Sequence, residues 1–185
     1  MKTSQPHRNE IYPKILKLQE RMNVAHLRNV FVYLATFVLL TGAPAIFGKS
    51  ENKVTKEGDT YVVSLTGNDQ MKYNITAFEV PAGSTVRIEM ENIGKLPAQA
   101  MSHNFVVLEP DTDPNSFSLT AAQARASNFI PESMTDSILA HTQLLGPGES
   151  DSIEFEAPPP GDYTYLCSFP AHYQTGMTGT MSVTK

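Results

Sequence analysis

Short runs of apolar and β-branched residues recur from about residue 61 to the end of the chain, separated by turn-forming residues. Runs of this length, bounded by Gly and Pro, are typical of β-strands. The expected strands are 61–65, 77–80, 85–90, 104–108, 138–145, 152–155, 163–167 and 180–184. Turns such as Pro81-Ala82-Gly83 and Gly146-Pro147-Gly148 supply the backbone dihedrals needed between strands. The pattern predicts an all-β sandwich.

One stretch departs from this rhythm. Residues 119–126 are rich in alanine, and Ser118 or Thr120 can cap the start of a helix there. We therefore expect one short helix inserted between strands. It carries no metal-binding side chain, so we expect it to contribute packing.

The N-terminal part has a different hydrophobic pattern, with an apolar run from Val30 to Leu40 that continues weakly to Phe47. It fits a signal peptide, because Ala43-Pro44-Ala45 resembles a small-residue cleavage site. It also fits an uncleaved helical anchor, because 18 residues from 30 to 47 come close to the roughly 20 that cross a bilayer. Both interpretations place the rest of the chain outside the cytoplasm, in the periplasm or on the outer face of the membrane.

These patterns divide the chain into three parts: a basic N-terminal segment with the signal peptide or anchor (1–48), a polar linker (49–60) and one folded domain (61–185). From residue 46 onward there are 8 Lys and Arg against 17 Asp and Glu, a formal charge of 8 − 17 = −9. Such an acidic domain is a poor match for nucleic acid. It suits basic protein partners, with charge mainly setting encounter rate and orientation.

Cys167 is the only cysteine in the chain, and it lies in a segment with two other metal-binding residue types. His172 follows it by five residues, and Met177 follows after five more. Each residue by itself is more often an ordinary packed side chain. Three donor types in one Pro- and Gly-bearing loop instead favour copper, because soft sulfur favours Cu(I) while nitrogen keeps Cu(II) accessible.

A further donor has to come from another part of the chain, and His103 is the candidate. It precedes an apolar run that predicts a buried strand, and a ligand at the start of a strand is rigidly held. One thiolate, two imidazoles and a distant thioether form a mononuclear blue-copper (type 1) site. Such a site holds one copper ion and passes single electrons between redox proteins.

Other copper functions use similar donors. A periplasmic protein that binds and delivers copper also needs Cys, His and Met, and it remains the alternative function. Copper enzymes such as multicopper oxidases and nitrite reductases need additional histidine-rich sites. Only His7, His26 and His141 remain beside the two candidate ligands, and the first two lie in or before the apolar segment. The sequence therefore favours a carrier over an enzyme.

Several separated stretches resemble the azurin and auracyanin branch of the cupredoxins, over roughly residues 61–185. Besides the loop from Cys167 to Met177, the matching stretches are 67–71, 96–97 with 101–104, and 138–142 with 146–152. The resemblance implies a cupredoxin-like Greek-key β-sandwich with one short inserted helix, here preceded by an N-terminal hydrophobic helix. It also implies an electron-carrier function.

Carried over by position, the resemblance implies three equatorial copper ligands and one axial ligand: His103, Cys167 and His172, with Met177 axial. It further implies that Asn104 steadies the thiolate loop and that the Phe169 backbone N–H donates to the sulfur. Contacts of this kind tune a bound metal.

Two positions qualify the resemblance. Ser102 stands where azurins have a glycine whose carbonyl approaches copper, and a β-carbon there can restrict the backbone. His141 matches a family histidine that is not a ligand.

The resemblance also places the ring edge of His172 at the surface within an apolar docking face for redox partners, formed by Met101, Pro170, Ala171 and Tyr173.

Overall fold

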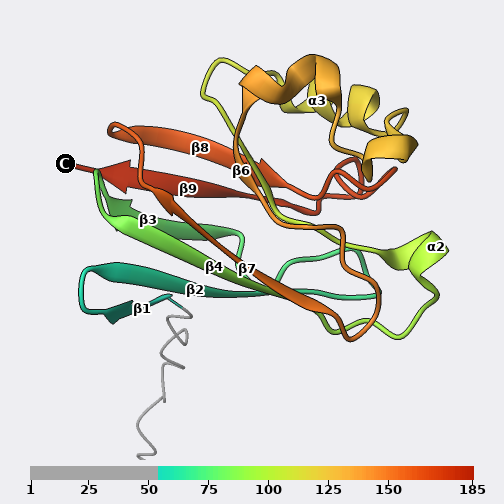
Figure 1. The fold of residues 1–185 in the computed structure, drawn as a ribbon, viewed down its shortest axis with the longest axis horizontal. Helices are drawn as coiled ribbons and strands as arrows, with labels where there is room; N and C mark the ends of the chain where they lie inside the picture. Colours follow the sequence, from blue (N-terminus) through green and yellow to red (C-terminus); the bar gives the residue numbers. More distant parts are fainter. Residues whose placement is uncertain (1–53) are drawn as a thin grey trace, which may run out of the picture. The chain divides into compact units, whose positions relative to one another are not determined.

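The computed structural model describes residues 54–185, which form two packed β-sheets with short helices beside them (Figure 1). The basic segment, the apolar run at 30–47 and the choice between signal peptide and anchor lie outside these residues. Among residues 54–185, no helix is both long and apolar enough to span a membrane.

The first sheet has four strands in the order β1-β2-β4-β7. β1 (Val54–Glu57) pairs antiparallel with β2 (Thr60–Gly67), and β2 runs parallel to β4 (Thr85–Asn92). β4 in turn pairs antiparallel with β7 (Ser150–Glu156). β1 was not predicted, and it lies in the stretch 49–60 that we interpreted as a linker. The charged composition of β1 does not predict a strand. The strand forms because all four of its residues pair with β2.

The second sheet has five strands in the order β3-β9-β8-β5-β6. Their bounds are Ala77–Pro81 (β3), Thr178–Thr184 (β9), Gly161–Leu166 (β8), Val106–Leu108 (β5) and Ile138–His141 (β6). β3 and β9 are parallel, and the other neighbours are antiparallel. All eight predicted strands are present. The largest error is in β6, which ends four residues before the predicted end at 145.

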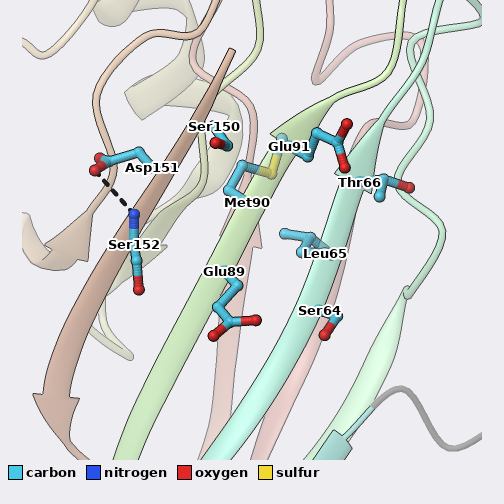
Figure 2. A pocket seen from close by; sticks show the side chains of 9 residues that line it. All are labelled: Ser64, Leu65, Thr66, Glu89, Met90, Glu91, Ser150, Asp151 and Ser152. Carbon is cyan, nitrogen blue, oxygen red and sulfur yellow. Dashed lines mark hydrogen bonds between the residues drawn. The ribbon is translucent and has the colours of Figure 1, made fainter. Parts of the chain in front are cut away.

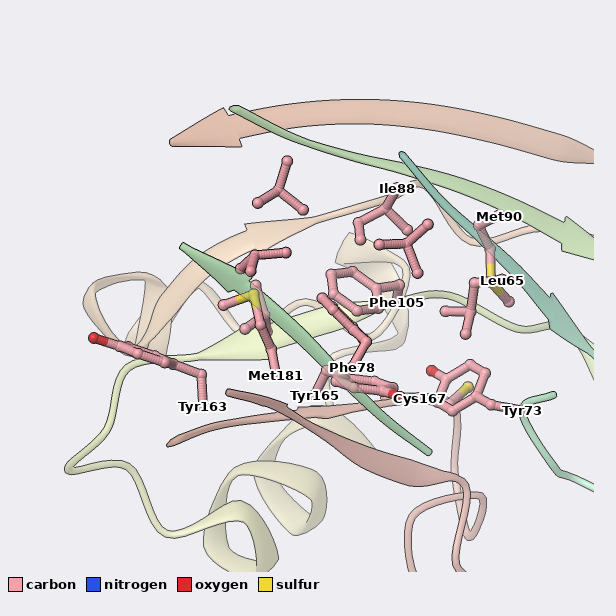
Figure 3. Close-up of a cluster of buried hydrophobic side chains, with 14 of the residues drawn as sticks. Leu65, Tyr73, Phe78, Ile88, Met90, Phe105, Tyr163, Tyr165, Cys167 and Met181 are labelled. Carbon is pink, nitrogen blue, oxygen red and sulfur yellow. The ribbon is translucent and has the colours of Figure 1, made fainter. Parts of the chain in front are cut away.

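The core lies between the two sheets (Figure 3). Side chains alternate across a strand, so Tyr163 and Tyr165 of β8 and the following Cys167 all enter this core. Leu166, with the opposite parity, enters a second cluster under the inserted helix. β5 is buried on both faces for the same reason, since its three residues divide between the two clusters.

The inserted helix α3 spans Pro114–Ala121, so the prediction of a helix is correct but its bounds of 119–126 are wrong. The helix starts earlier because the Asp113 side chain accepts a hydrogen bond from the Ser116 backbone N–H at 2.8 Å, with Pro114 in the first turn. The alanine-rich stretch ends this helix and leads into 3₁₀ turns at Arg125–Ser127 and Glu132–Ser137. A further short helix, α2 (Ala98–Met101), was not predicted.

The outer face of the four-stranded sheet carries polar side chains (Figure 2). An open groove there is lined by residues of β2, β4 and β7, including Ser64, Glu89 and Glu91. Farther along the same face, Arg87 donates to Glu154 at 2.7 Å and to Glu57 at 3.1 Å. These ion pairs tie β1 and β7 to β4 across the solvent-facing side of the sheet.

Candidate metal centre

His103 is held by backbone pairing and by a buried asparagine. Its N–H donates to the Leu145 carbonyl at 3.0 Å, and the Leu145 N–H donates back to His103 at 2.8 Å. The Asn92 side-chain amide donates to the carbonyls of Met101 and Leu145, each at 2.9 Å. His103 is fully buried. These hydrogen bonds hold the backbone on either side of His103 in place without any bound metal.

The loop after β8 closes on itself through backbone hydrogen bonds. The Cys167 N–H donates to the Met177 carbonyl at 3.1 Å, and the Met177 N–H donates to the His172 carbonyl at 2.9 Å. Ala171 (φ 69°) and Gly176 (φ 91°) take the left-handed backbone conformation that tightens the turns. The loop thus brings its cysteine, histidine and methionine to one end of the sandwich.

Three predicted donors converge. The ligand atoms of His103, Cys167 and His172 all lie within 4.8 Å of one another. The two histidine Nδ1 atoms are 3.2 Å apart, and His172 Nδ1 is 3.5 Å from Cys167 Sγ. Two imidazole nitrogens and one sulfur thus face a common point inside the protein.

Met177 is also fully buried, and its side chain and that of His103 both lie against Gly67. A β-carbon placed on Gly67 would lie 2.9 Å from both His103 Cδ2 and Met177 Cε. The end of β2 can approach these two side chains only because residue 67 has no side chain. Gly67 therefore forms the floor of the cluster.

Burial controls the protonation of the three converging groups. Burial lowers the pKa of His103, and it lowers the pKa of His172 to about 4, with the nearby His103 adding to the shift. Both imidazoles are therefore neutral near pH 7 and can offer a lone pair. Burial also raises the pKa of the Cys167 thiol to about 12, opposed by backbone hydrogen bonds from Asn104 and Phe169. A metal bound here has to displace that proton.

Asn104 joins the two segments that carry the donors. Its side-chain oxygen accepts from the Ser168 N–H at 2.9 Å, and its side-chain amide donates to Ser168 Oγ at 2.8 Å. His103 and Cys167 are the sequence neighbours of these two residues, so the bonds fix the spacing between the segments. The Phe169 backbone is also close enough to the sulfur to lower its pKa.

A family model described as copper-binding proteins of the plastocyanin/azurin family matches residues 59–184. The chain belongs to this family. Auracyanin-B of Chloroflexus aurantiacus is 39% identical over 117 residues, which cover 63% of this chain and 48% of that protein. Azurin of Alcaligenes faecalis is 33% identical over 125 residues, 65% of this chain and 96% of azurin.

The fold is also similar to solved structures. Dithionite-reduced auracyanin from Roseiflexus castenholzii superposes with a TM-score of 0.61 at 32% identity, covering 70% of this chain and all of that one. The expectation of a cupredoxin fold is thereby confirmed. The cluster of His103, Cys167 and His172 fits a single type 1 copper site of this family, because its donors are one sulfur and two neutral imidazoles.

Ser102 has an ordinary backbone conformation. Its φ of −80° and ψ of 149° are ordinary extended values, and its hydroxyl donates to the Ala98 carbonyl at 2.8 Å. The β-carbon of Ser102 is therefore accommodated without backbone strain. His141 lies on β6, exposed and paired with Val106, outside the three-residue donor cluster.

The predicted docking face is only partly exposed. His172 is 2% exposed and Met101 is 8% exposed, so the prediction that the His172 ring edge reaches the surface is corrected. The Phe169 ring packs on His172 with centroids 4.8 Å apart, and Phe129 packs on Phe169 at 5.0 Å. Of the loop positions, Ala171 is exposed, while Pro170 and Tyr173 are half-buried.

The sequence analysis missed Gly67 and Asn92, which support the centre, and Tyr73, whose hydroxyl donates a hydrogen bond to the Asn104 carbonyl. Gly67 was noticed only as part of the family resemblance. Asn92 ends a strongly alternating strand at a position of inward parity, so a polar residue there was a usable signal of a buried hydrogen-bonding role. Tyr73 follows a polar turn and has no distinctive pattern.

Proposed function

We propose that this protein is a type 1 blue-copper electron carrier, with His103, Cys167 and His172 as equatorial ligands and Met177 as the axial ligand. The observation that carries the proposal is the convergence of the first three ligand atoms within 4.8 Å in the core. Membership of a copper-binding family supports the metal. The burial of Met177 beside His103 supports the axial role.

The protein's contribution is a donor set that stays in place. Copper bound there would accept and pass single electrons by cycling between Cu(II) and Cu(I). Hydrogen bonds within the loop hold Cys167, His172 and Met177, and strand pairing holds His103. Because these bonds hold the segments that carry the donors, the same sulfur and imidazole ligands can serve both oxidation states. The buried setting also keeps water away from the sulfur.

An electron carrier fits this site better than copper delivery or an enzyme. Cys167, His103 and Met177 are fully buried, and His172 is 2% exposed. A delivery protein has to pass its ion to an acceptor, and a metal enzyme commonly keeps a coordination position open. A site closed on all sides retains its ion and exchanges only electrons.

The partners of such a carrier are redox proteins, which we place at the loop end of the sandwich. Ala171 lies at the surface and is the sequence neighbour of His172, which supports this end as the point of electron exchange. We propose an extracytoplasmic or periplasmic location, supported by the N-terminal pattern and by the similarity to azurin and auracyanin. Residues 30–47 would provide either export or attachment to the membrane.

The test is a titration of the full chain with Cu(II), followed by visible absorption and paramagnetic resonance. We expect an intense thiolate-to-copper band and narrow copper hyperfine splitting, and both are lost in Cys167→Ser. His172→Ala also loses the band, whereas His141→Ala keeps it, because His141 lies outside the cluster. Folded protein that binds no copper, or binds it without this band, contradicts the proposal.

Stable retention separates the carrier from a delivery protein. The reduced, copper-loaded chain is incubated with a Cu(I) chelator and its copper content is followed through repeated oxidation and reduction. A carrier keeps its copper through many cycles. Rapid loss to the chelator in the folded protein would favour delivery.

A further inference from the structure

Tyr73 lies beside the metal centre without belonging to its donor set. It follows a tight turn that begins at Gly67, and the two residues form an isolated antiparallel bridge. Within the turn the Asn68 N–H donates to the Lys72 carbonyl at 3.2 Å. Gly67 touches the His103 and Met177 side chains, as described above. The turn therefore delivers the Tyr73 ring into the core at the same end as the donors.

The Tyr73 hydroxyl is buried and has a specific acceptor. It donates a hydrogen bond to the backbone carbonyl of Asn104. The residue is 6% exposed and belongs to the same core cluster as Cys167, and Figure 3 shows the two side chains together. Burial raises the pKa of Tyr73 well above its usual value, and Cys167 adds to the shift.

The acceptor residue is the one that links the two donor segments. Asn104 bonds to Ser168 twice through its side chain, and its backbone lies close enough to the Cys167 sulfur to lower the pKa of the thiol. Tyr73 thus fixes one end of Asn104, and Ser168 fixes the other. The chain of contacts runs from Tyr73 through Asn104 to the residues around the sulfur.

We propose that Tyr73 is a positioning residue for the copper thiolate, acting through its hydrogen bond to Asn104. This inference rests on the proposed function. Hydrogen bonds to a ligating sulfur tune the redox potential of a blue-copper site. If the Asn104 carbonyl loses its bond to Tyr73, Asn104 moves more freely and its backbone donates less effectively to the sulfur. The Cu(II) thiolate is then relatively favoured, and the reduction potential falls.

Tyr165 offers a matched control in the same cluster. Its ring lies 5.7 Å from that of Tyr73, and its hydroxyl also donates to a backbone carbonyl, that of Ile75 at 2.6 Å. Ile75 is not adjacent in sequence to any proposed ligand. Tyr73→Phe and Tyr165→Phe therefore each remove one phenol hydroxyl from the same core. Only Tyr73→Phe removes a hydrogen bond to a residue next to a proposed ligand.

The first measurement compares the two variants of the full chain after copper loading. We expect Tyr73→Phe to lower the reduction potential and to shift the thiolate-to-copper band and the copper hyperfine splitting. Tyr165→Phe should lower thermal stability and leave all three quantities at their wild-type values. Equal changes in both variants, or no change in Tyr73→Phe, overturn the positioning role.

The second measurement needs no copper. Amide hydrogen exchange is followed in the metal-free full chain, because the Ser168 N–H donates to Asn104 Oδ1. We expect this amide to exchange about tenfold faster in Tyr73→Phe and within about twofold of wild type in Tyr165→Phe, since local opening sets the rate. Unchanged exchange in Tyr73→Phe overturns the link through Asn104. If the wild-type chain has no blue-copper band, the proposed function fails, and the exchange result still decides whether Tyr73 holds Asn104 in place.

Discussion

The two sheets of the sandwich differ in what covers their outer faces. The five-stranded sheet is covered by the inserted helix, where Phe117 and Ala121 pack on Val106, Leu108 and Leu166. The four-stranded sheet turns an open, polar face to solvent (Figure 2). The proposed ligands come from the covered sheet, just before β5 and just after β8.

This difference indicates why the metal centre lies where it does. Strands buried on both faces are held by side chains from two directions, so the residues at their ends have little freedom to move. A centre that holds two oxidation states without changing its ligands needs that restraint. The solvent-facing sheet contributes Gly67 and Asn92 to the centre from its inner side.

Phe117→Ala tests whether the covering helix supports the centre. The side chain is fully buried, so its removal should lower the free energy of unfolding by about 3–5 kcal/mol. Because Phe117 packs in one cluster with Leu166 and Tyr173, the variant should also broaden the copper band. Urea unfolding and visible absorption check both effects. Leu119→Ala on the same helix, 56% exposed, is the control. A loss below about 1 kcal/mol would contradict the supporting role.

Gly67→Ala tests the floor of the centre. The added methyl group would lie 2.9 Å from His103 Cδ2 and from Met177 Cε, so these side chains have to shift. We expect a destabilisation of about 1–3 kcal/mol and a lower affinity for copper, because the site is overpacked. Gly161→Ala is the control, since its new methyl group would meet only Tyr163 at an ordinary 3.7 Å. Equal copper affinity in the two variants would refute the role of Gly67.

Arg87→Met tests the solvent-facing sheet and should have the smallest effect. The Arg87 side chain is 31% exposed, and its partners Glu57 and Glu154 are 61% and 51% exposed. Exposed ion pairs are weak and are screened by salt. We expect a small fall in the urea midpoint at low salt that vanishes near 1 M salt, roughly where the screening length is about 3 Å. A changed copper spectrum would show that this face does communicate with the centre.

The alternation of apolar residues predicted most of the fold, because period-two patterns survive wherever a strand has one buried face. The errors have physical causes. β1 is largely exposed and gains its structure from pairing with β2, which its own composition does not reveal. The helix was placed too late because alanine content was weighed above the cap at Asp113 and the proline at 114.

The part of the candidate site that was predicted best is the part whose residues lie close together in the sequence. Cys167, His172 and Met177 share one loop, so their spacing alone brings the donors together. His103 was assigned from its place before an apolar run, and the structure brings it to within hydrogen-bonding distance of His172. The burial of His172 was not foreseen, because it depends on Phe169 and Phe129, and the latter comes from the inserted segment.

The sequence by itself determined the sandwich, the donor types and the loop that carries three of them, because these depend on local spacing and side-chain chemistry. Only the tertiary structure decided how His103 meets that loop, which glycine has to lie beneath it and which tyrosine fixes Asn104. These are contacts between residues far apart in the chain. They exist only after the two sheets have packed, and packing at the density of a protein core leaves one arrangement for them.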